Sequence, residues 1–498
     1  MTVTFRDPLA PMVRAVLPVD LPHTVGRLLQ NGGRMQMAYG RFLENGAVEL
    51  RYVASRGAGE PFEIWICHPD GSAPSISGVS PLMGWYEREI TDLCGTRFID
   101  QPDPSPLLLH DGVQASCPLL ERDVALRLTR PGDGGAPEVS NPDIQRLPFG
   151  PVRADVVESA ELIFFYVGER ILHFHPQLFF KHRGMEKRFE GCPLPKAMVL
   201  AERISGVGSF SHALAFCQAV EHAAGCLPPP RALMLRALLA ELERIYNHLH
   251  YLGHLAHTTT LKVGEAQGKL LEEQAKQING RLTGSRFLRG LLQPGGLRRD
   301  IRLDSWLVKA LTALRHEAGQ YMAMLERTSS HLDRLMTTGF LDRRTAFDQG
   351  ATGPVERASG LDRDLRRDHP YAAYSHLSVA VPVQSKGDAH ARAQIRMAEL
   401  EASFALIDQI LEFLPDGTVC LSCQPLPEAE GLGWVEGPRG TLFYTVHFGA
   451  DGRLSRVKIK SPSFSNWRVF PFSVHDSNMM DYAINEASFG LTVAGCDR

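Results

Sequence analysis

Alternating apolar and polar positions dominate the first hundred residues of the chain. Three period-two segments, "MQMAYGRFL", "AVELRYVAS" and "FEIWICH", lie within residues 33–68 and are separated by glycine-bearing turns. Such alternation indicates antiparallel strands that bury one face. The following segment, "PLMGWYEREITDLCGTRF", places Tyr86, Ile90, Leu93 and Cys94 on one helical stripe. Residues 1–100 are therefore predicted to form a small α+β module.

A region rich in proline and glycine follows this module. Nine prolines and the tract "PGDGGAPEVSNP" lie between residues 101 and 151. We interpret 101–148 as a linker that contains short extended pieces and marks a domain boundary. The second domain, 149–498, opens with a predicted strand pair over 161–180.

Apolar residues at helical spacing predict four long helices in the second domain. The clearest, 228–257, begins at three prolines and carries a broad apolar face that includes Leu235, Leu242 and Leu249. The others cover 266–290, 302–337 and 386–414. A β-hairpin with a Gly-Ala-Asp-Gly turn (440–463) and a short helix (476–488) follow. The predicted fold class is α+β, with a helical-bundle core and peripheral β-hairpins.

Composition and charge exclude several classes of protein. The hydrophobic share of 44% and the charged share of 22% are those of a globular protein. A net charge of −3 with scattered basic residues argues against a nucleic-acid partner. We expect no membrane span and no export, because long apolar stretches and a signal-peptide core are missing. The nine cysteines, of which only Cys420 and Cys423 lie close together, indicate reduced thiols in the cytosol.

Short motifs give weak evidence for metal, redox or phosphate chemistry. His248, His250, His254 and His257 include pairs at helical spacing, but no H-E-x-x-H and no cysteine pair accompanies them. Polar packing of a helix face is therefore the preferred interpretation. The single "CLSC" (420–423) is interpreted as structural thiols. The segment "GVGSFSH" lacks the Lys-Ser/Thr of a phosphate loop.

Charged residues gather in the segment 179–206, at the edge of the predicted helical core. They are His182, Arg183, Glu186, Lys187, Glu202 and Arg203. Such a group is either a set of solvated helix ends or a buried polar network, and buried acids and bases are typical of proton-handling sites. The sequence pattern alone leaves both interpretations open and favours the solvated helix ends.

Several motifs, in one order, resemble subunits of respiratory complex I and of related hydrogenases. "WYEREITDLCGTRF" (85–98) is similar to the signature of the small hydrophilic subunit of complex I. Four further segments resemble the quinone-site subunit of complex I. They are "HRGMEK" (182–187), "ELERIYNHL" (241–249), "PGGLRRD" (294–300) and "EGPRGTLFY" (436–444). The chain is still more similar to the large subunit of membrane-bound, energy-converting nickel–iron hydrogenases of the formate-hydrogenlyase type. In that type the two modules are fused in this order.

The chain departs from this family at the metal ligands. The resemblance implies two C-x-x-C pairs whose four thiolates hold nickel and iron. Ser205 and Gly208 stand at the first pair of positions, and Thr492 and Gly495 at the second, while Cys496 is one residue out of place. We therefore expect no nickel–iron site and no other metal in this chain.

The quinone ligands of the complex I homologue are replaced as well. Arg153 and Val157 stand where the family has two histidines, and Gly206 stands where it has a tyrosine. The segment 201–216 thus resembles a hydrogenase loop without its ligands more than a quinone-site loop.

The resemblance implies a subunit of a membrane-associated complex, related to NADH:quinone oxidoreductase and to hydrogenases, that is not catalytic alone. It would couple electron transfer in an iron–sulfur partner subunit to ion translocation by membrane-arm subunits, from a peripheral position on the cytoplasmic side of the plasma membrane. The chain has no ferredoxin-like cysteine run, so the iron–sulfur cluster is expected in the partner. NAD and quinone binding are expectations for the complex. A divergent quinone-reducing subunit, a structural connector and, least favoured, an active hydrogenase are the alternatives.

The resemblance also implies a central cavity beside the "HRGMEK" loop. His182, Arg183 and Glu186 are the candidates for a proton or coupling network there, and the cavity would be lined by Arg153, Arg203, Ser205, Gly206, Gly208, Arg357, Thr492 and Gly495. Burial would raise the pKa of Glu186 and neighbouring arginines would lower it, which would suit a carboxylate that exchanges a proton.

Overall fold

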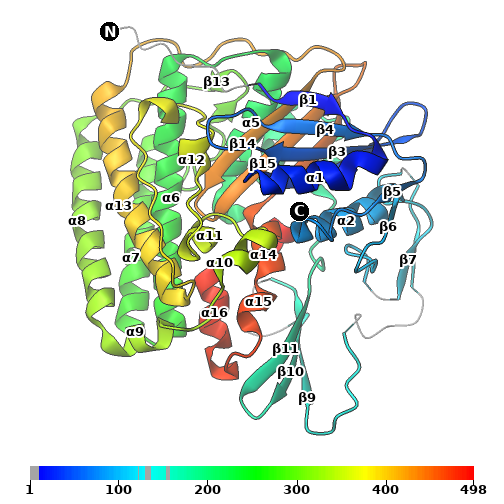
Figure 1. Cartoon of the computed structure of the whole chain (residues 1–498). Coiled ribbons are helices and arrows are strands. Elements are labelled where there is room, and N and C mark those ends of the chain that lie inside the picture. Colours follow the sequence, from blue (N-terminus) through cyan, green and yellow to red (C-terminus); the bar gives the residue numbers. More distant parts are fainter. Residues whose placement is uncertain (1–9, 111, 122, 129–135, 153–157) are drawn as a thin grey trace.

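A four-stranded sheet is the centre of the N-terminal module in the computed structural model, which describes residues 10–110, 112–121, 123–128, 136–152 and 158–498 (Figure 1). Its strands, in spatial order, are β1 (Met12–Ala15), β4 (Glu63–Cys67), β3 (Val48–Ser55) and β2 (Arg34–Phe42). β1 is parallel to β4 and the other neighbours are antiparallel. The three strands predicted within 33–68 are confirmed, and β1 joins them as an edge strand.

Two helices accompany this sheet. They are α1 (Leu21–Gln30) and α2 (Gly84–Cys94), and the parallel pair β5 (Ser72–Pro74) and β6 (Arg97–Ile99) flanks α2. The predicted stripe of α2 is buried. A Cβ on Gly40 in β2 would lie 2.6 Å from Sγ of Cys94, so only glycine lets the helix approach the strand this closely.

The segment predicted as a linker carries short strands. β7 (Val113–Ala115) pairs with β8 (Leu126–Leu128), and β9 (Gln145–Phe149) joins β10 (Glu161–Val167) and β11 (Arg170–Gln177) in a sheet that extends away from the rest of the chain (Figure 1). Leu107, Leu108 and Leu120 are buried in the hydrophobic cluster that also contains residues of both domains. The segment 101–148 therefore contributes three leucines to the hydrophobic cluster of the two domains, while β9 near its end is exposed.

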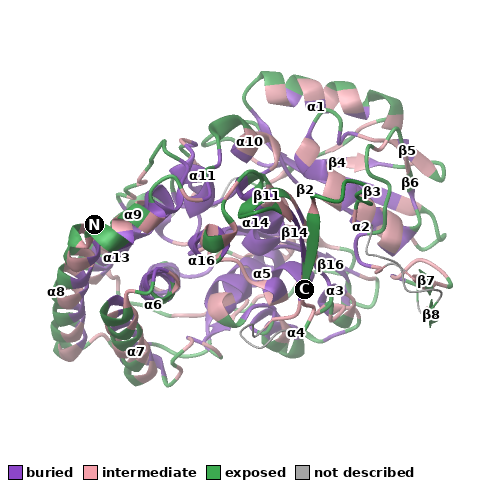
Figure 2. Cartoon of the chain, turned by 90° about the horizontal axis from the view of Figure 1, so that it is seen from below, coloured by how far each residue is buried: buried purple, intermediate pink, exposed green. Residues whose placement is uncertain are grey.

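Long helices stand side by side in the second domain. They are α5 (Ser209–Ala224), α6 (Pro230–Thr258), α7 (Lys262–Thr283), α8 (Ser305–Arg327) and α13 (Ala389–Phe413), and the short α9 (Ser329–Leu335) follows α8. α6 is buried almost throughout, whereas α7 and α8 expose their outer faces (Figure 2). None of the helices in the described ranges combines the length and the hydropathy that a bilayer span requires.

Two predicted helix boundaries were wrong for local reasons. α7 ends at Thr283 rather than near residue 290, because Gly284 adopts a left-handed conformation with φ of 76° and caps the helix. The predicted helix 302–337 is interrupted at Thr328, whose ψ of 95° is extended, so that α8 and α9 are separate.

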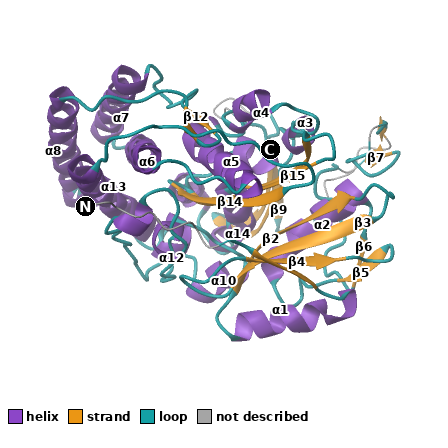
Figure 3. Cartoon of the chain, turned by 90° about the horizontal axis from the view of Figure 1, so that it is seen from above, coloured by secondary structure: helices purple, strands orange, loops and turns teal. Residues whose placement is uncertain are grey.

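The hairpin predicted near residue 450 is a buried three-stranded sheet. β14 (Glu430–Gly437), β15 (Gly440–Phe448) and β16 (Leu454–Lys460) are antiparallel, and every residue of β15 is buried. α5 packs against β14 so closely that a Cβ on Gly433 would lie 2.0 Å from the carbonyl oxygen of Ala215. The N-terminal sheet covers the other side (Figure 3). The α+β class is confirmed, but this sheet is internal, not peripheral.

The remaining elements are short. They are α3 (Met185–Arg188), α4 (Leu194–Ala201), β12 (Leu292–Gln293), β13 (Gly296–Leu297), α10 (Arg343–Asp348), α11 (Pro354–Ala358), α12 (Leu365–Asp368), α14 (Pro462–Val469), α15 (Pro471–Val474), α16 (Tyr482–Phe489) and α17 (Val493–Asp497). The short helix predicted over 476–488 corresponds to α16, which begins six residues later.

Candidate functional site

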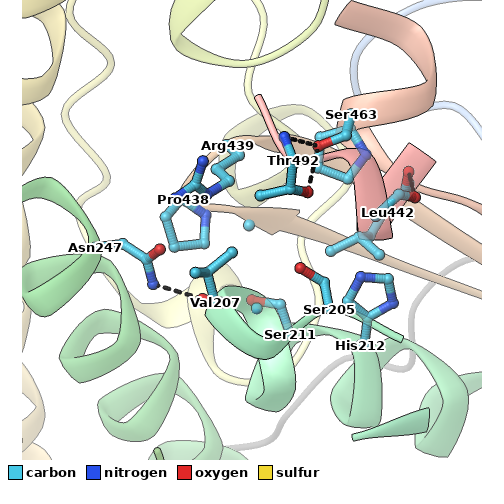
Figure 4. A pocket seen from close by; sticks show the side chains of 15 residues that line it. Ser205, Val207, Ser211, His212, Asn247, Pro438, Arg439, Leu442, Ser463 and Thr492 are labelled. Carbon is cyan, nitrogen blue, oxygen red and sulfur yellow. Dashed lines mark hydrogen bonds between the residues drawn. The ribbon is translucent and has the colours of Figure 1, made fainter. Parts of the chain in front are cut away.

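Four positions from opposite ends of the second domain meet at one small cavity. Ser205 and Gly208 flank the turn before α5, whereas Thr492 and Gly495 belong to the start of α17. All four line a cavity of about 20 Å³, together with Asn247, Arg439 and His212 (Figure 4). Such a volume accommodates about one or two water molecules. The structure thus brings together the residues that the sequence placed at the metal-ligand positions, and Gly206 lies in the same turn.

Arg183 holds the two walls of this cavity together. Its guanidinium donates to the carbonyl oxygens of Arg203 (3.0 Å) and Ile204 (2.7 Å), just before Ser205, and to that of Ala494 (3.1 Å) in α17. The carboxylate of Glu158 holds the start of α17: it accepts hydrogen bonds from the backbone N–H groups of Val493 (2.5 Å) and Ala494 (3.0 Å). A carboxylate at a helix N-terminus is favoured by the helix dipole.

Two side chains of α6 fix the start of α5 and the turn before it by hydrogen bonds. Glu243 accepts hydrogen bonds from the backbone N–H groups of Phe210 (2.8 Å) and Ser211 (2.9 Å). Burial raises the pKa of Glu243 to about 6, in spite of these donors. Asn247 donates to the carbonyl oxygen of Val207 at 2.8 Å. His212 shares a hydrogen bond with the Tyr444 hydroxyl at 2.8 Å, and burial lowers the pKa of this imidazole to about 3, so it is neutral.

Replacing Arg183 by methionine tests its clamping role. The variant keeps most of the apolar stem but leaves three carbonyl groups without their charged donor. We expect the free energy of unfolding to fall by about 2 kcal/mol and backbone hydrogen exchange in α17 to accelerate. Arg203→Met is the matched control, because that side chain is 50% exposed and lies 3.8 Å from its nearest carboxylate. Equal exchange rates in α17 for the two variants would contradict the role.

Glu186 belongs to a separate buried set of charges, which we call the Glu186 cluster. Its members are Glu89 from α2, Glu186 from α3, Arg456 and Lys458 from β16, and the last residue, Arg498. Glu186 lies 3.0 Å from Arg456, 3.1 Å from Lys458 and 3.3 Å from Arg498. Although burial raises the pKa of Glu186, these three cations lower it to about 2.

The proton role expected for Glu186 stays a prediction, and this geometry argues against it. A carboxylate whose pKa is lowered to about 2 by three cations is ionised near neutral pH, as an anchor for cations would be. Its cations are also not those expected: Arg203 is half-exposed and Arg357 lies in another network. Arg153 lies outside the described residues. His182 is held by the carbonyl oxygen of Asp497 at 2.7 Å, and burial lowers its pKa.

Arg357 is part of a third set of buried charges, which we call the carboxylate network. It contains Glu241, Asp364, Glu399 and Glu436 with Arg244, Arg357 and Arg366, each at most 2% exposed. Glu399 is the centre, at 2.5 Å from Arg357, 2.8 Å from His248 and 3.5 Å from Arg244. This network was not predicted from the sequence, although "ELERIYNHL" places Glu241, Arg244 and His248 at helical spacing on a buried helix.

Comparison with known proteins covers both modules. Residues 49–127 match the family of the respiratory-chain NADH dehydrogenase 30 Kd subunit, and residues 271–426 and 419–498 match that of the 49 Kd subunit. Residues 183–279 match nickel-dependent hydrogenases. Formate hydrogenlyase subunit 5 of Escherichia coli is 30% identical over 481 residues, which are 93% of this chain and 84% of the relative. The chain belongs to this family of complex I and hydrogenase-related subunits.

Further members of the family extend the likeness. Hydrogenase-4 component G of Escherichia coli is 30% identical, with 82% of this chain and 72% of the relative covered. The C/D subunit of NADH-quinone oxidoreductase from Cereibacter sphaeroides is 28% identical, with 86% and 82% covered. A chain of the membrane-bound sulfane sulfur reductase, an archaeal respiratory membrane complex, superposes with a TM-score of 0.68 at 26% identity, covering 72% of this chain and 100% of that one. The resemblance stated from the motifs is confirmed.

The residues at the cavity do not fit the nickel–iron centre that the family resemblance implies. That centre needs soft thiolate ligands, and the four positions offer two hydroxyls and two glycines. The hydroxyl of Thr492 is already engaged with that of Ser463 at 3.0 Å. A Cβ on Gly495 would lie 2.6 Å from Oγ1 of Thr492, so the threonine fills the space of a side chain there. Cys496 is fully buried and does not line the cavity.

The other candidate ligands are in ordinary contacts. His248 is part of the carboxylate network, whereas His250 and His257 pair with Glu272 (3.0 Å) and Glu265 (2.9 Å) on α7. The nine cysteines are free thiols. Within the described ranges, no group of three or more histidine, cysteine or acidic side chains is arranged to hold a metal ion.

Proposed function

We propose that this chain is a core subunit of a membrane-bound respiratory complex that works without a nickel–iron centre. In this role it couples electron transfer in an iron–sulfur partner subunit to ion translocation by membrane-arm subunits. It would be a peripheral subunit on the cytoplasmic side of the plasma membrane. The relatives that support this proposal are named as subunits of formate hydrogenlyase, NADH-quinone oxidoreductase and a respiratory membrane complex.

One observation carries the proposal: the scaffold around the former ligand positions is intact although the ligands are gone. Arg183 joins the two walls, Glu158 holds the start of α17, and Glu243 fixes the start of α5. A site that had lost all use would not need a charged clamp between two distant segments. The clamp suits a device that transmits a change from one wall to the other.

The size of the cavity favours coupling over substrate chemistry at this position. Organic ligands occupy pockets of roughly 300–1,000 Å³, whereas this cavity holds about 20 Å³. A quinone ring therefore does not enter it without movement of α17 or the turn before α5.

The proposal predicts the metal content of the purified complex and the subunits that co-purify with the chain. The tagged chain is purified from membranes of its host grown with added nickel, and its co-purifying subunits are identified by mass spectrometry. We expect iron from a cluster-bearing partner, membrane-arm subunits, and no stoichiometric nickel, because Ser205, Gly208, Thr492 and Gly495 provide no thiolates. About one nickel per chain would contradict the proposal. Recovery of the chain only as a monomer outside the membrane fraction would contradict it as well.

A further inference from the structure

A polar cleft between the N-terminal module and the core ends at the carboxylate network. Its volume is about 230 Å³, and its walls include Arg34, Gln36 and Ser55 from the N-terminal module and Glu356, Arg363, Asp364, Glu436 and Thr441 from the core. Such a space is large and polar enough to hold several water molecules. Nη1 of Arg363 is buried without a hydrogen-bond partner among the described side chains, and water in the cleft would satisfy it.

The carboxylate network has one acid too many. Four carboxyl groups face three guanidinium groups, and all seven side chains are at most 2% exposed. His248 does not restore the balance, because burial lowers its pKa to about 4 in spite of Glu399. An uncompensated charge in such a place is costly. The fourth negative charge is therefore removed by a proton on one of these carboxyl groups or balanced by a further buried cation nearby, for which Lys460 is the candidate.

Glu436 is the carboxyl group with the weakest compensation. Glu399 touches three basic groups, and Glu241 contacts Arg366 (3.1 Å), Arg244 (3.2 Å) and two hydroxyl groups. Asp364 lies 2.7 Å from Arg366. The carboxylate of Glu436, by contrast, lies 3.2 Å from Arg357 and accepts one backbone hydrogen bond at 3.3 Å. Glu436 also lines the polar cleft, as Asp364 does, whereas Glu241 and Glu399 do not.

Lys460 is a buried cation close to the same cleft. It is 4% exposed, and among the described ion pairs none joins its ammonium group to a carboxylate. Instead, Nζ donates to Oε1 of Gln36 at 3.3 Å and to Oγ1 of Thr441 at 3.1 Å, and both of these residues line the cleft. A buried lysine held only by neutral groups gives up its proton readily.

We propose that Glu436 and Lys460 form a proton-exchange site that is supplied by water in this cleft. A proton passes from a hydronium ion in the cleft to a carboxylate oxygen of Glu436 and leaves a neutral water molecule; the Lys460 ammonium returns a proton to water by the reverse route. Only the use of this site in ion translocation rests on the proposed function; the site itself is a property of the chain.

The surroundings of the pair favour exchange near neutral pH. Glu436 faces Arg357 and Glu356 from α11, Asp364 from the segment before α12, Arg244 from α6 and Lys460 from β16. Burial and the negative charge of Asp364 raise the pKa of Glu436 to about 8. Burial and the positive charge of Arg34 lower the pKa of Lys460 to about 7.

Infrared difference spectroscopy of the purified full-length chain tests the site. A buried protonated carboxyl group gives a carbonyl band that disappears on ionisation. We expect a component of this band to titrate with a midpoint near pH 8 and to be absent in Glu436→Gln, which matches the protonated side chain in shape and should fold normally by circular dichroism. Burial also raises the pKa of Glu87 and Asp497 to about 7 and that of Glu243 to about 6, so their components titrate at lower pH and remain in the variant. Glu430→Gln is the matched control on the same strand: although burial raises its pKa, hydrogen bonds from His447 and Arg51 hold it at about 2, so the band should remain.

The Lys460→Arg variant provides a second, independent test, which measures the midpoint of the carboxyl band. The guanidinium group stays charged at all relevant pH values, so it should stabilise ionised Glu436 and move the midpoint of the band to lower pH. The inference is overturned if no carboxyl component of the wild-type chain titrates near pH 8, if this component survives in Glu436→Gln, or if Lys460→Arg leaves its midpoint in place.

The intact complex separates this site from its proposed use. In complexes reconstituted in vesicles, Glu436→Gln should retain electron transfer and lose coupled ion transport, while Glu430→Gln retains both. Normal transport in a Glu436→Gln complex whose infrared band is missing would overturn the role in coupling, and it would count against the proposed function, not against the proton site.

Discussion

Glu399→Gln is expected to destabilise the chain by about 4 kcal/mol, because it removes one partner from a buried set of charges. Glu399 accepts hydrogen bonds from Arg357 at 2.5 Å and from His248 at 2.8 Å, and all three side chains are essentially inaccessible. Although burial raises the pKa of Glu399, Arg357 and the other basic neighbours hold it well below the ordinary value, so the carboxylate is ionised. The amide puts an NH2 donor in place of one carboxylate oxygen, so that one of the donors on Arg357 and His248 loses its acceptor inside the core. Urea unfolding of the purified chain measures the loss.

Glu401→Gln is the control for this variant. Glu401 lies two residues away on the same helix, but its side chain is 41% exposed and its ion pair with Arg315 (3.1 Å) lies in solvent. Such a pair contributes roughly 0–1 kcal/mol. If Glu399→Gln and Glu401→Gln unfold at the same urea concentration, the carboxylate network does not stabilise the fold as the structure indicates.

Glu186→Gln should cost about 3 kcal/mol near neutral pH and little in acid. The folded-state pKa of Glu186 is about 2, against an ordinary value of 4.5. Because the pKa is lowered on folding, the contribution of this carboxylate is complete above pH 4.5 and is lost as the pH falls toward 2. A difference of about 2.5 pKa units corresponds to about 3 kcal/mol. Unfolding of wild type and variant is compared across this pH window.

The shape of the pH dependence distinguishes an ion-pair anchor from a proton carrier. The gap between wild type and Glu186→Gln should be wide at pH 6 to 7, where a proton carrier would already titrate, and should close only in acid. Glu190→Gln is the nearby control, since Glu190 pairs with the half-exposed Lys187 at 2.7 Å and should lose roughly 1 kcal/mol or less. A gap that closes around neutral pH would restore the proton role first expected for Glu186.

The architecture could be predicted where local periodicity is strong. The three strands within residues 33–68, α2, α6 and α13 follow directly from apolar residues at spacings of two and of three to four. Boundaries that depend on backbone conformation could not be predicted in this way: the left-handed Gly284 and the extended Thr328 end helices inside continuous apolar patterns. The internal position of the sheet β14–β15–β16 also needed the fold, because its second face is covered by the distant N-terminal module.

The sequence by itself determined the family and the loss of the thiolates, because both are written in residue identities: ordered motifs, and Ser205, Gly208, Thr492 and Gly495 where cysteines are implied. Only the tertiary structure decided which charges meet. Glu186 pairs with Arg456, Lys458 and Arg498, about 270 to 310 residues away, and Glu436 meets Arg357 and Asp364 at the end of a cleft that two modules enclose. Ionisation depends on distance and on exclusion of water, and neither is a property of position along the chain. A glutamate carboxyl group is thus an ionised anchor at position 186 and a proton-exchange site at position 436.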